Sequence, residues 1–449
     1  MARTPRVLRG FRDFPPQQMI LRQHVISIFQ GVFERYGFEP IQTPILEYFD
    51  VLSSKYGEDE KLIYHFEDRG GREVGLRYDL TVPLARFVAT HRGELSFPFK
   101  RYHIEPVFRA DQPQRGRYRQ FWQCDADVVG TSSMMADAEV MMVWMDCLSA
   151  VNIPGFVIHV NHRKLLQALA QAAGVGDNEA VTIHRAVDKL EKIGRQGVMD
   201  EMTGHGISEQ SASTVLDLVS LSGDADSVLA ELRQRLAGFA LAQEGIVDLT
   251  NLFNYLSEMG ADPSHYSLDL SLARGLDYYT GPVFEAKVPD EQIGSLGGAG
   301  RYDGLIGMFI GEDIPATGCS LGLEPILDVV QDRHLLPLPS TVTDVLVTIH
   351  NDELAANSLD LIGKLRNAGV AAEIYLGQRR DLRRQLQYAN RKQIPVTAFL
   401  GEQEVQSAVV KLKEMTSGDE VNVPVAELDK VVESIHRLAA NARSTAASQ

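Results

Sequence analysis

The sequence contains little cysteine and no long apolar run, and both shortages narrow the class of protein. Its three cysteines, Cys124, Cys147 and Cys319, are odd in number and far apart. This argues against a disulfide framework or a cysteine-rich metal site and favours a reducing compartment. The longest apolar runs, such as residues 140–145, are far shorter than the roughly 20 residues that span a bilayer. Because the first residues also lead into no apolar secretory segment, we expect a cytoplasmic protein without a membrane segment.

The sequence also lacks the excess of basic residues that favours binding to nucleic acid. The formal net charge is −16 at pH 7, whereas neutralising phosphates requires lysine and arginine. Two local clusters of basic residues, in residues 100–119 and 379–392, are exceptions to the negative net charge. Either cluster could be ordinary solvated surface charge. An acidic protein with two basic clusters is also consistent with transient binding of a polyanion.

The common nucleotide-binding motifs are absent as well. The glycine-rich run at residues 294–304 has neither the Lys-Ser/Thr of a P-loop nor the spacing of the dinucleotide fingerprint. Glycine allows the backbone to approach a ligand closely, and it also allows a tight turn. We favour the close approach, with the tight turn as the alternative.

The order of the elements predicts an α/β (α+β) protein. Apolar residues at helical spacing predict a helix that ends at Gly37, and the proline-punctuated residues 41–47 predict an extended segment at a sheet edge or a subunit contact. Residues 63–130 alternate short β-rich runs with turns, as in an antiparallel sheet. The periodicity then becomes helical over residues 163–259, which predicts a helical insertion.

The last part of the chain follows a proline-punctuated linker near residues 335–340. Strand and helix patterns alternate beyond it, as in a parallel or mixed sheet. We therefore predict a first domain at residues 1–335, a small α/β domain at 341–440 and a disordered tail at 441–449.

One candidate site lies at residues 75–83. Arg77 and Asp79 are two residues apart, so both would point from one face of a strand. They could belong to a functional site or form an ion pair on a sheet surface, and this segment alone does not decide.

Residues 108–127 form a stronger candidate. Their pattern predicts two antiparallel strands joined by a long polar loop. The period of two places Gln123, Asp125 and Asp127 on one face of the second strand. Because arginines and acids that converge on a sheet are costly to desolvate, we favour a functional site over ordinary core.

These segments, with Arg274-Gly275-Leu276-Asp277-Tyr278-Tyr279 and the glycine-rich run, together resemble the histidyl-tRNA synthetases, and the resemblance extends over essentially the whole chain. Gly10–Asp13 is similar to the N-terminal signature, although the family usually has threonine at Phe11. Residues 17–44 resemble class II motif 1, and residues 109–127 resemble motif 2. The resemblance implies an antiparallel-sheet class II catalytic domain with a helical insertion, an anticodon-binding domain and a homodimer.

The resemblance also implies an activity, histidine–tRNA ligase. ATP and Mg²⁺ would activate L-histidine to histidyl-adenylate, and the histidyl group would pass to the 3′ end of tRNA-His. Arg109 would hold the α-phosphate and the histidine carboxylate, and Arg274 would act from the opposite side. Asp111 and Arg117 would help to seat ATP, with Glu285 as a candidate contributor to the metal site.

The remaining implied residues bind histidine or tRNA. Gln114 and Arg115 would face the acceptor end of tRNA, Arg383 and Arg384 would face the anticodon, and the insertion would lie over the acceptor stem. The implied histidine-binding residues are Asp79, Leu80, Thr81, Arg109, Gln123, Asp127, Arg274, Tyr278, Tyr279 and Tyr302.

One position departs from the class II pattern. Motif 3 usually ends in an arginine that contacts the γ-phosphate of ATP, and Pro325 stands at that position in Gly322-Leu323-Glu324-Pro325. Since proline carries no charge, another cation such as Arg301 or an extra Mg²⁺ could stabilise the triphosphate. Alternatively, the chain could be a histidine-binding regulatory paralogue with weak or absent charging. Regulatory relatives lose the Arg274 signature and the C-terminal domain, whereas this chain keeps both.

Overall fold

A computed structural model describes residues 4–53, 57–114, 116–273, 278–289, 294–336, 340–377 and 381–447. The chain divides into two compact units, one of residues 1–13 and 25–335 and one of residues 14–24 and 336–449. No helix among the described residues is both long enough and apolar enough to cross a membrane.

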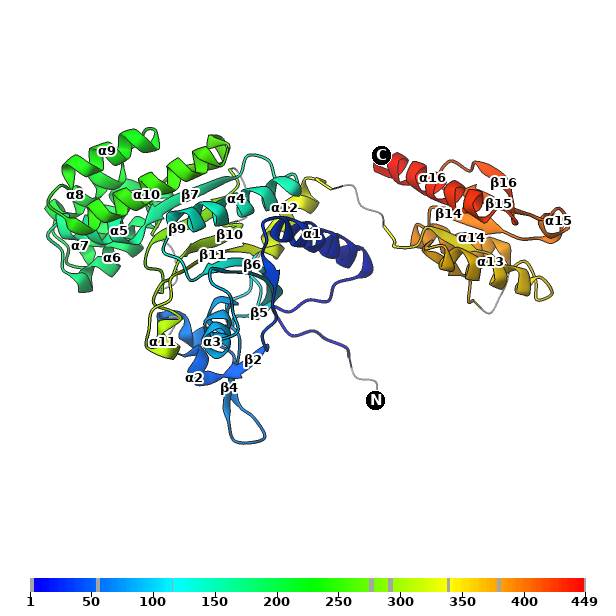
Figure 1. The fold of residues 1–449 in the computed structure, drawn as a ribbon, viewed down its shortest axis with the longest axis horizontal. Helices are drawn as coiled ribbons and strands as arrows, with labels where there is room; N and C mark the ends of the chain where they lie inside the picture. Colours follow the sequence, from blue (N-terminus) through cyan, green and yellow to red (C-terminus); the bar gives the residue numbers. More distant parts are fainter. Residues whose placement is uncertain are drawn as a thin grey trace. The chain divides into compact units, whose positions relative to one another are not determined.

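An eight-stranded sheet forms the centre of the first unit (Figure 1). Its inner neighbours are antiparallel, as predicted for a class II catalytic domain, and only β1 with β5 and β7 with β8 are parallel. In spatial order the strands are β1 Glu39–Pro40, β5 Phe99–Phe108, β6 Gln120–Val129, β11 Ala316–Gly322, β10 Gly297–Arg301, β9 Pro282–Lys287, β7 Val157–His162 and β8 Tyr266–Leu268.

One face of this sheet is mostly apolar and is covered by helices α4 (Met134–Ala150), α10 (Ala240–Glu258) and α12 (Leu323–Asp332). Successive strand residues point to opposite faces, so Cys124 and Ala126 on β6 face the helices. Trp144 of α4 is fully buried, and a Cβ on Gly297 of β10 would lie 3.0 Å from its ring. The opposite face of the sheet is thereby left for polar residues.

The predicted helical insertion is confirmed. Six helices cover residues 163–258, and α10 contacts α4, α5 and α9 (green in Figure 1). Val215, Leu218 and Val219, which recur at helical spacing in this stretch, are buried. The helices that precede α10 are α5 Arg163–Ala172, α6 Asp177–Val187, α7 Leu190–Gly204, α8 Glu209–Val219 and α9 Ala225–Arg235.

The N-terminal part differs from the prediction in one element. Residues after Leu76 were predicted as strand, but helix α3 begins at Thr81 and runs to His91. Pro83 is compatible with this helix because it lies in the first turn, where backbone N–H groups lack helical partners anyway. The other elements here are α1 Pro16–Arg35, a small sheet of β2 Leu46–Tyr48, β4 Glu73–Leu76 and β3 His65–Glu67, α2 Phe49–Leu52 and the 3₁₀ helix Gly57–Leu62; η2 Pro263–His265 and α11 Gly307–Ile310 lie farther along the chain.

The second unit is the predicted small α/β domain with a mixed sheet. Strand β12 is parallel to β13 and β14, whereas β15 and β16 are antiparallel. Val345 and Val347 of β12 pack with Leu361 and Ile435 in its core. In spatial order the strands are β13 Ala372–Ile374, β12 Val345–Val347, β14 Val396–Phe399, β15 Val409–Glu414 and β16 Glu420–Pro424, and the helices are α13 Ala355–Asn367, α14 Leu382–Lys392, α15 Glu402–Gln406 and α16 Leu428–Ala447.

The predicted disordered tail requires a correction, because α16 continues to Ala447. Ala439 and Ala442 are buried on this helix, and Arg443 forms a 2.6 Å ion pair with Asp344. Alanine has high helix propensity, and the alanines near the end of the chain favour continuation of the helix. Residues 448 and 449 lie outside the described residues.

Candidate active site

The second face of the eight-stranded sheet carries a row of polar residues, here called the polar face. Direct cross-strand partners share a face. His103 on β5 lies opposite Asp125 on β6, and Asp125 lies opposite Ser320 on β11. The row continues through Gly298 on β10 to Glu285 on β9. Neighbouring rows add Arg101, Glu105, Gln123, Asp127, Gly300, Gly318 and Gly322.

Glycines make room on this face. A Cβ on Gly318 would lie 1.9 Å from Asp127 Oδ1, and a Cβ on Gly300 would lie 2.7 Å from the ring of Tyr279. Among the described residues, the atom nearest to such a Cβ on Gly298 is the Phe284 carbonyl oxygen, at 4.0 Å. Within the described part of the chain, the glycine-rich run thus leaves open space beside buried acids, which supports the predicted close approach of backbone to a ligand.

Asp127 is the centre of the buried charges on the polar face. Its Oδ2 lies 2.6 Å from Arg101 Nη2, and its Oδ1 accepts a hydrogen bond from Tyr302. All three side chains are buried, and burial raises the pKa of both Asp127 and Tyr302. Asp127 and Tyr302, two of the predicted site residues, are therefore in direct contact.

Asp79 is placed by helix α3 rather than by a strand. Its Oδ1 accepts hydrogen bonds from the backbone N–H groups of Thr81 and Val82, at 3.2 and 3.0 Å. Its Oδ2 accepts one from the Tyr278 hydroxyl at 3.3 Å, which joins two segments that are distant in sequence. Leu80, the third predicted residue of this turn, has a fully buried side chain.

The predicted arrangement of Arg77 with Asp79 is wrong. The strand ends at Leu76, so the two side chains do not follow a strand's alternation. Arg77 is fully buried and donates to the carbonyl oxygens of Thr43 and Pro106 and to Glu105. It is a buried anchor between segments and not half of a surface ion pair.

The predicted loop joins the antiparallel strands β5 and β6, whose ends Phe108 and Gln120 lie opposite each other. Arg109 Nε donates to the Tyr78 carbonyl oxygen at 3.2 Å, and its guanidinium lies 4.2 Å from the centroid of the Tyr78 ring and 5.0 Å from that of Phe121. Two aromatic rings therefore fix the direction of this cation. The remaining guanidinium nitrogens could hold a bidentate anion.

The same loop brings together the other two predicted ATP residues. Arg117 Nε lies 2.6 Å from Asp111 Oδ2, with the arginine exposed and the aspartate mostly buried. Gln114 is exposed in the turn, where its backbone exchanges hydrogen bonds with that of Arg117.

Gln123 lies on the polar face as its alternation predicted. Its Nε2 donates to the Ser320 hydroxyl at 2.6 Å, while its Oε1 is buried without a protein partner among the described residues. A buried acceptor of this kind favours a ligand or water donor.

One residue of this row, His103, was not predicted to belong to the site. His103 is fully buried, and both of its ring nitrogens lack partners in the described part of the chain. Burial, with Arg101 and Arg77 nearby, lowers its pKa to about 2, so the ring is neutral. Burial raises the pKa of Asp125 to about 8. The alternation of Arg101, His103 and Glu105 on β5 was the signal in the sequence, but this stretch was interpreted as a basic cluster.

Glu285 lies toward the other edge of the polar face. It is buried, and its Oε2 is 3.7 Å from Lys287 Nζ. No group of three His, Cys, Asp or Glu side chains within the described ranges could hold a metal by itself. One buried carboxylate suits Mg²⁺ that arrives with a polyphosphate, because Mg²⁺ binds one or two carboxylates together with phosphates and water.

Arg301 cannot replace the positive charge of the arginine that motif 3 usually has at position 325. Alternation places it with Ala299 on the helix side of the sheet, opposite Thr317 and away from the polar face. There it contacts Asp137, Asp303 and the backbone carbonyls of Thr131 and Ser133. This expectation from the sequence is therefore corrected.

Arg274 and Arg115 lie outside the described residues. Both flanks of the Arg274 segment are anchored in the first unit. Asn161 donates to the carbonyl oxygens of Leu270 and Leu272 at 3.2 and 2.9 Å, and Thr280 N donates to the Arg301 carbonyl oxygen at 2.8 Å.

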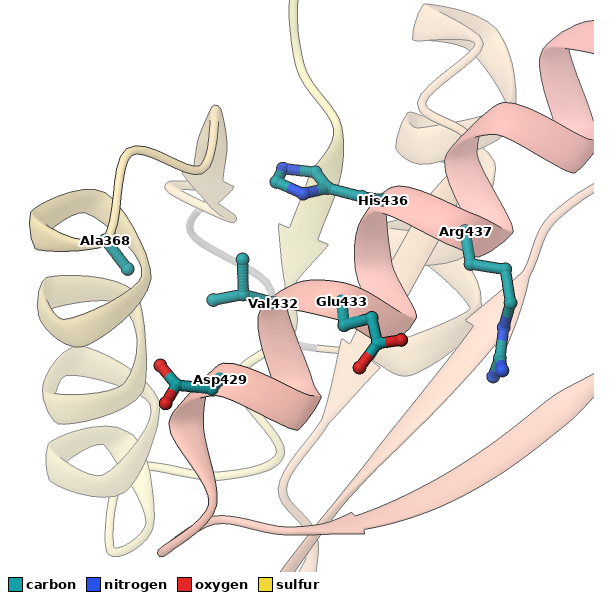
Figure 2. Close-up of a pocket in the computed structure, with 6 residues that line it drawn as sticks. All are labelled: Ala368, Asp429, Val432, Glu433, His436 and Arg437. Carbon is teal, nitrogen blue, oxygen red and sulfur yellow. The ribbon is translucent and has the colours of Figure 1, made fainter.

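The remaining predicted residues lie in the second unit. Arg383 and Arg384 are exposed in the first turn of α14, where Asp381 Oδ1 accepts the Arg383 N–H. This unit also has a cavity of about 560 Å³ along α16, where the side chains of Asp429, Glu433, His436 and Arg437 are exposed (Figure 2). They do not converge on a common point, so we place the chemistry on the polar face instead.

Comparison with known proteins now adds independent evidence. Residues 10–326 match the sequence profile of the histidyl-tRNA synthetase family. The chain belongs to this family. Residues 344–435 match the anticodon binding domain. A histidine–tRNA ligase from Aeropyrum pernix is 42% identical over 435 residues, which are 96% of this chain and 98% of that protein.

Solved structures give the same result. The crystal structure of histidyl-tRNA synthetase from Nostoc sp. PCC 7120 aligns with a TM-score of 0.86 and 32% identity, over 97% of this chain and 100% of that one. A Bacillus halodurans protein described as an ATP phosphoribosyltransferase regulatory subunit/histidyl-tRNA synthetase has a TM-score of 0.75 at 22% identity, over 86% of this chain and 97% of that one, which shows the fold alone. Because the relatives named as ligases match nearly end to end, the regulatory alternative is not favoured.

Proposed function

We propose that the chain is a histidine–tRNA ligase whose chemistry takes place on the polar face. The observation that carries the proposal is the convergence of Asp79, Gln123, Asp127 and Tyr302 beside the open space at Gly298, in a member of the histidyl-tRNA synthetase family. A charging assay with ATP, L-histidine and tRNA-His tests it directly. Histidine attached to the tRNA 3′ end supports the proposal, and its absence with active protein contradicts it.

The first step joins histidine to AMP. A carboxylate oxygen of histidine attacks the α-phosphorus of ATP, the bond to the β-phosphate oxygen breaks, and pyrophosphate leaves. Negative charge gathers at the α-phosphate, so positioned cations should dominate catalysis. Arg109 would bind the α-phosphate and the histidine carboxylate through its planar fork, and Arg274 would act at the same centre from the other side.

ATP would be seated by Arg109 together with Asp111 and Arg117, which the loop already holds in contact. Glu285 would contribute its carboxylate to the accompanying Mg²⁺, which neutralises phosphate charge when bound.

The site would recognise histidine at two places, its α-amino group and its imidazole ring. Asp79, Leu80, Thr81 and Gln123 would surround the α-amino group, the leucine through its backbone because its side chain is buried. The neutral imidazole has one donor and one acceptor. Its partners would be Asp127, Tyr278, Tyr279 and Tyr302, on the buried side of the site.

This polar recognition would also reject other amino acids. A site built to hydrogen-bond its substrate can reject an analogue without those groups by roughly 10⁴- to 10⁵-fold, because its own polar groups would stay unpaired. The chain would therefore need no editing domain.

In the second step the terminal ribose hydroxyl of tRNA attacks the carbonyl carbon of the adenylate, and AMP leaves. Gln114 and Arg115 would contact the acceptor end. The insertion, residues 163–259, would lie over the acceptor stem, and the domain at 341–440 would read the anticodon. We also propose a cytoplasmic homodimer that forms through residues 17–44, in which residues 1–335 make the catalytic domain.

The proposed anticodon contact can be tested separately from adenylate formation. The double variant Arg383→Glu/Arg384→Glu should raise the KM for tRNA-His by about 10-fold or more, because removing an arginine that neutralises a phosphate weakens binding and each new carboxylate repels the RNA backbone. Histidine-dependent ATP–pyrophosphate exchange should be unchanged. A parallel fall in both activities would contradict the assignment of these arginines to tRNA.

A further inference from the structure

The N-terminal segment, residues 9–12, lies against the loop of the polar face and brings a cation to it. Arg119 N donates to the Gly10 carbonyl oxygen at 2.9 Å, and the Arg119 side chain reaches the Arg9 carbonyl oxygen at 3.4 Å. Gly10 has φ of +86°, and a Cβ there would lie 2.8 Å from the Arg119 side chain. The backbone just before Arg12 is therefore held tightly, which limits where this side chain can lie.

Arg12 extends from this segment toward the start of α12. Its Nη2 lies 3.6 Å from Oε1 of Glu324, the residue directly before Pro325. Glu324 is buried and its Oε2 accepts the Trp122 N–H of β6 at 2.8 Å, so this carboxylate is fixed to the edge of the site. Arg12 therefore lies near Pro325, which stands at the position where motif 3 usually has an arginine.

An aromatic ring also holds the guanidinium. The Arg12 Cζ lies 3.3 Å from the centroid of the Tyr118 ring, next to Arg117 in the loop. The Arg12 side chain is 30% exposed. Its Nη2 lies within ion-pair distance of Glu324 Oε1, so the carboxylate helps to orient this cation.

We propose that Arg12 supplies to the triphosphate of ATP the positive charge that Pro325 does not. The proposal rests on the proposed ligase function, since ATP is the polyanion concerned. Arg12 and Arg117 would together approach the β- and γ-phosphates. The α-phosphate would be held by Arg109 and would not depend on Arg12.

The test compares ATP with AMP, because only ATP carries the distal phosphates. Equilibrium binding of each nucleotide is measured for wild type, Arg12→Met and Arg9→Met. Removal of one charged hydrogen-bond donor should weaken ATP binding about 10- to 100-fold in Arg12→Met and leave AMP binding unchanged. Arg9, an exposed arginine on the same segment, controls for a general change in surface charge. The KM for ATP in exchange should rise in parallel, while the KM for histidine stays constant.

A rescue variant separates this role from a structural one. Pro325→Arg introduced into Arg12→Met should restore most of the ATP affinity, because it returns an arginine to the same neighbourhood. Equal weakening of ATP and AMP, unchanged ATP binding in Arg12→Met, or a double variant no better than Arg12→Met would each overturn the proposal. The binding measurement does not depend on catalysis, so it distinguishes failure of this proposal from failure of the ligase function. A wild-type protein without exchange activity would contradict the ligase function and not the role of Arg12.

Discussion

Replacement of Arg109 by methionine should reduce histidine-dependent ATP–pyrophosphate exchange by about 10²- to 10³-fold, the usual effect of removing one positioned donor from a developing negative charge. Arg109 is the described arginine whose guanidinium is held between Tyr78 and Phe121 at the edge of the polar face. Most of the loss should appear in kcat, since the interaction strengthens as charge gathers at the α-phosphate.

Arg109→Lys is the matched variant, because it keeps the charge and loses the planar fork. If bidentate geometry matters, lysine should restore only part of the activity. Thermal unfolding of both variants controls for loss of structure. A well-folded Arg109→Met protein with exchange within a few-fold of wild type would contradict the placement of the α-phosphate at this residue.

The second large effect is expected at Asp127. Asp127→Asn should raise the KM for histidine by about 100-fold, because the imidazole would no longer have a buried charged hydrogen-bond partner. It should also lower the free energy of unfolding by about 3 kcal/mol, since Arg101 would keep a buried charge without its carboxylate. Steady-state exchange kinetics and urea unfolding measure the two effects separately.

Asp137 provides the matched control. It is also a fully buried aspartate paired with an arginine, Arg301, but it lies on the helix side of the same sheet. Asp137→Asn should destabilise the protein less, because Arg301 keeps Asp303 and two carbonyl oxygens, and it should leave the KM for histidine unchanged. Equal rises in that KM for the two variants would show that Asp127 acts only through stability.

Most of the correct predictions about the site came from the alternation of side chains along a strand, with its period of two. Gln123, Asp125 and Asp127 were placed on one face from β6 alone, and their partners in the sheet confirm it. The same period applied to β5 would have found Arg101 and His103. Which strands pair, and in which register, depends on long-range packing, so the row that joins His103 to Glu285 could not be predicted from local pattern.

The errors have physical causes of the same kind. Arg77 is anchored by two carbonyl oxygens and Glu105, partners that come from segments far along the chain. Helix α3 was missed because Pro83 and the strand-like residues before it outweighed the capping role of Asp79. Arg301 was misplaced because a charged residue beside a glycine-rich run suggests a ligand, whereas the strand directs its side chain to α4.

The central claim is that this chain activates histidine on the polar face. Histidine-dependent ATP–pyrophosphate exchange tests it most directly, with purified protein, with and without tRNA-His, and with Arg274→Ala as the control. The account predicts robust exchange in wild type without tRNA, and loss of that exchange in Arg274→Ala. Histidine binding without exchange in wild type would contradict it and would indicate a regulatory protein on this fold.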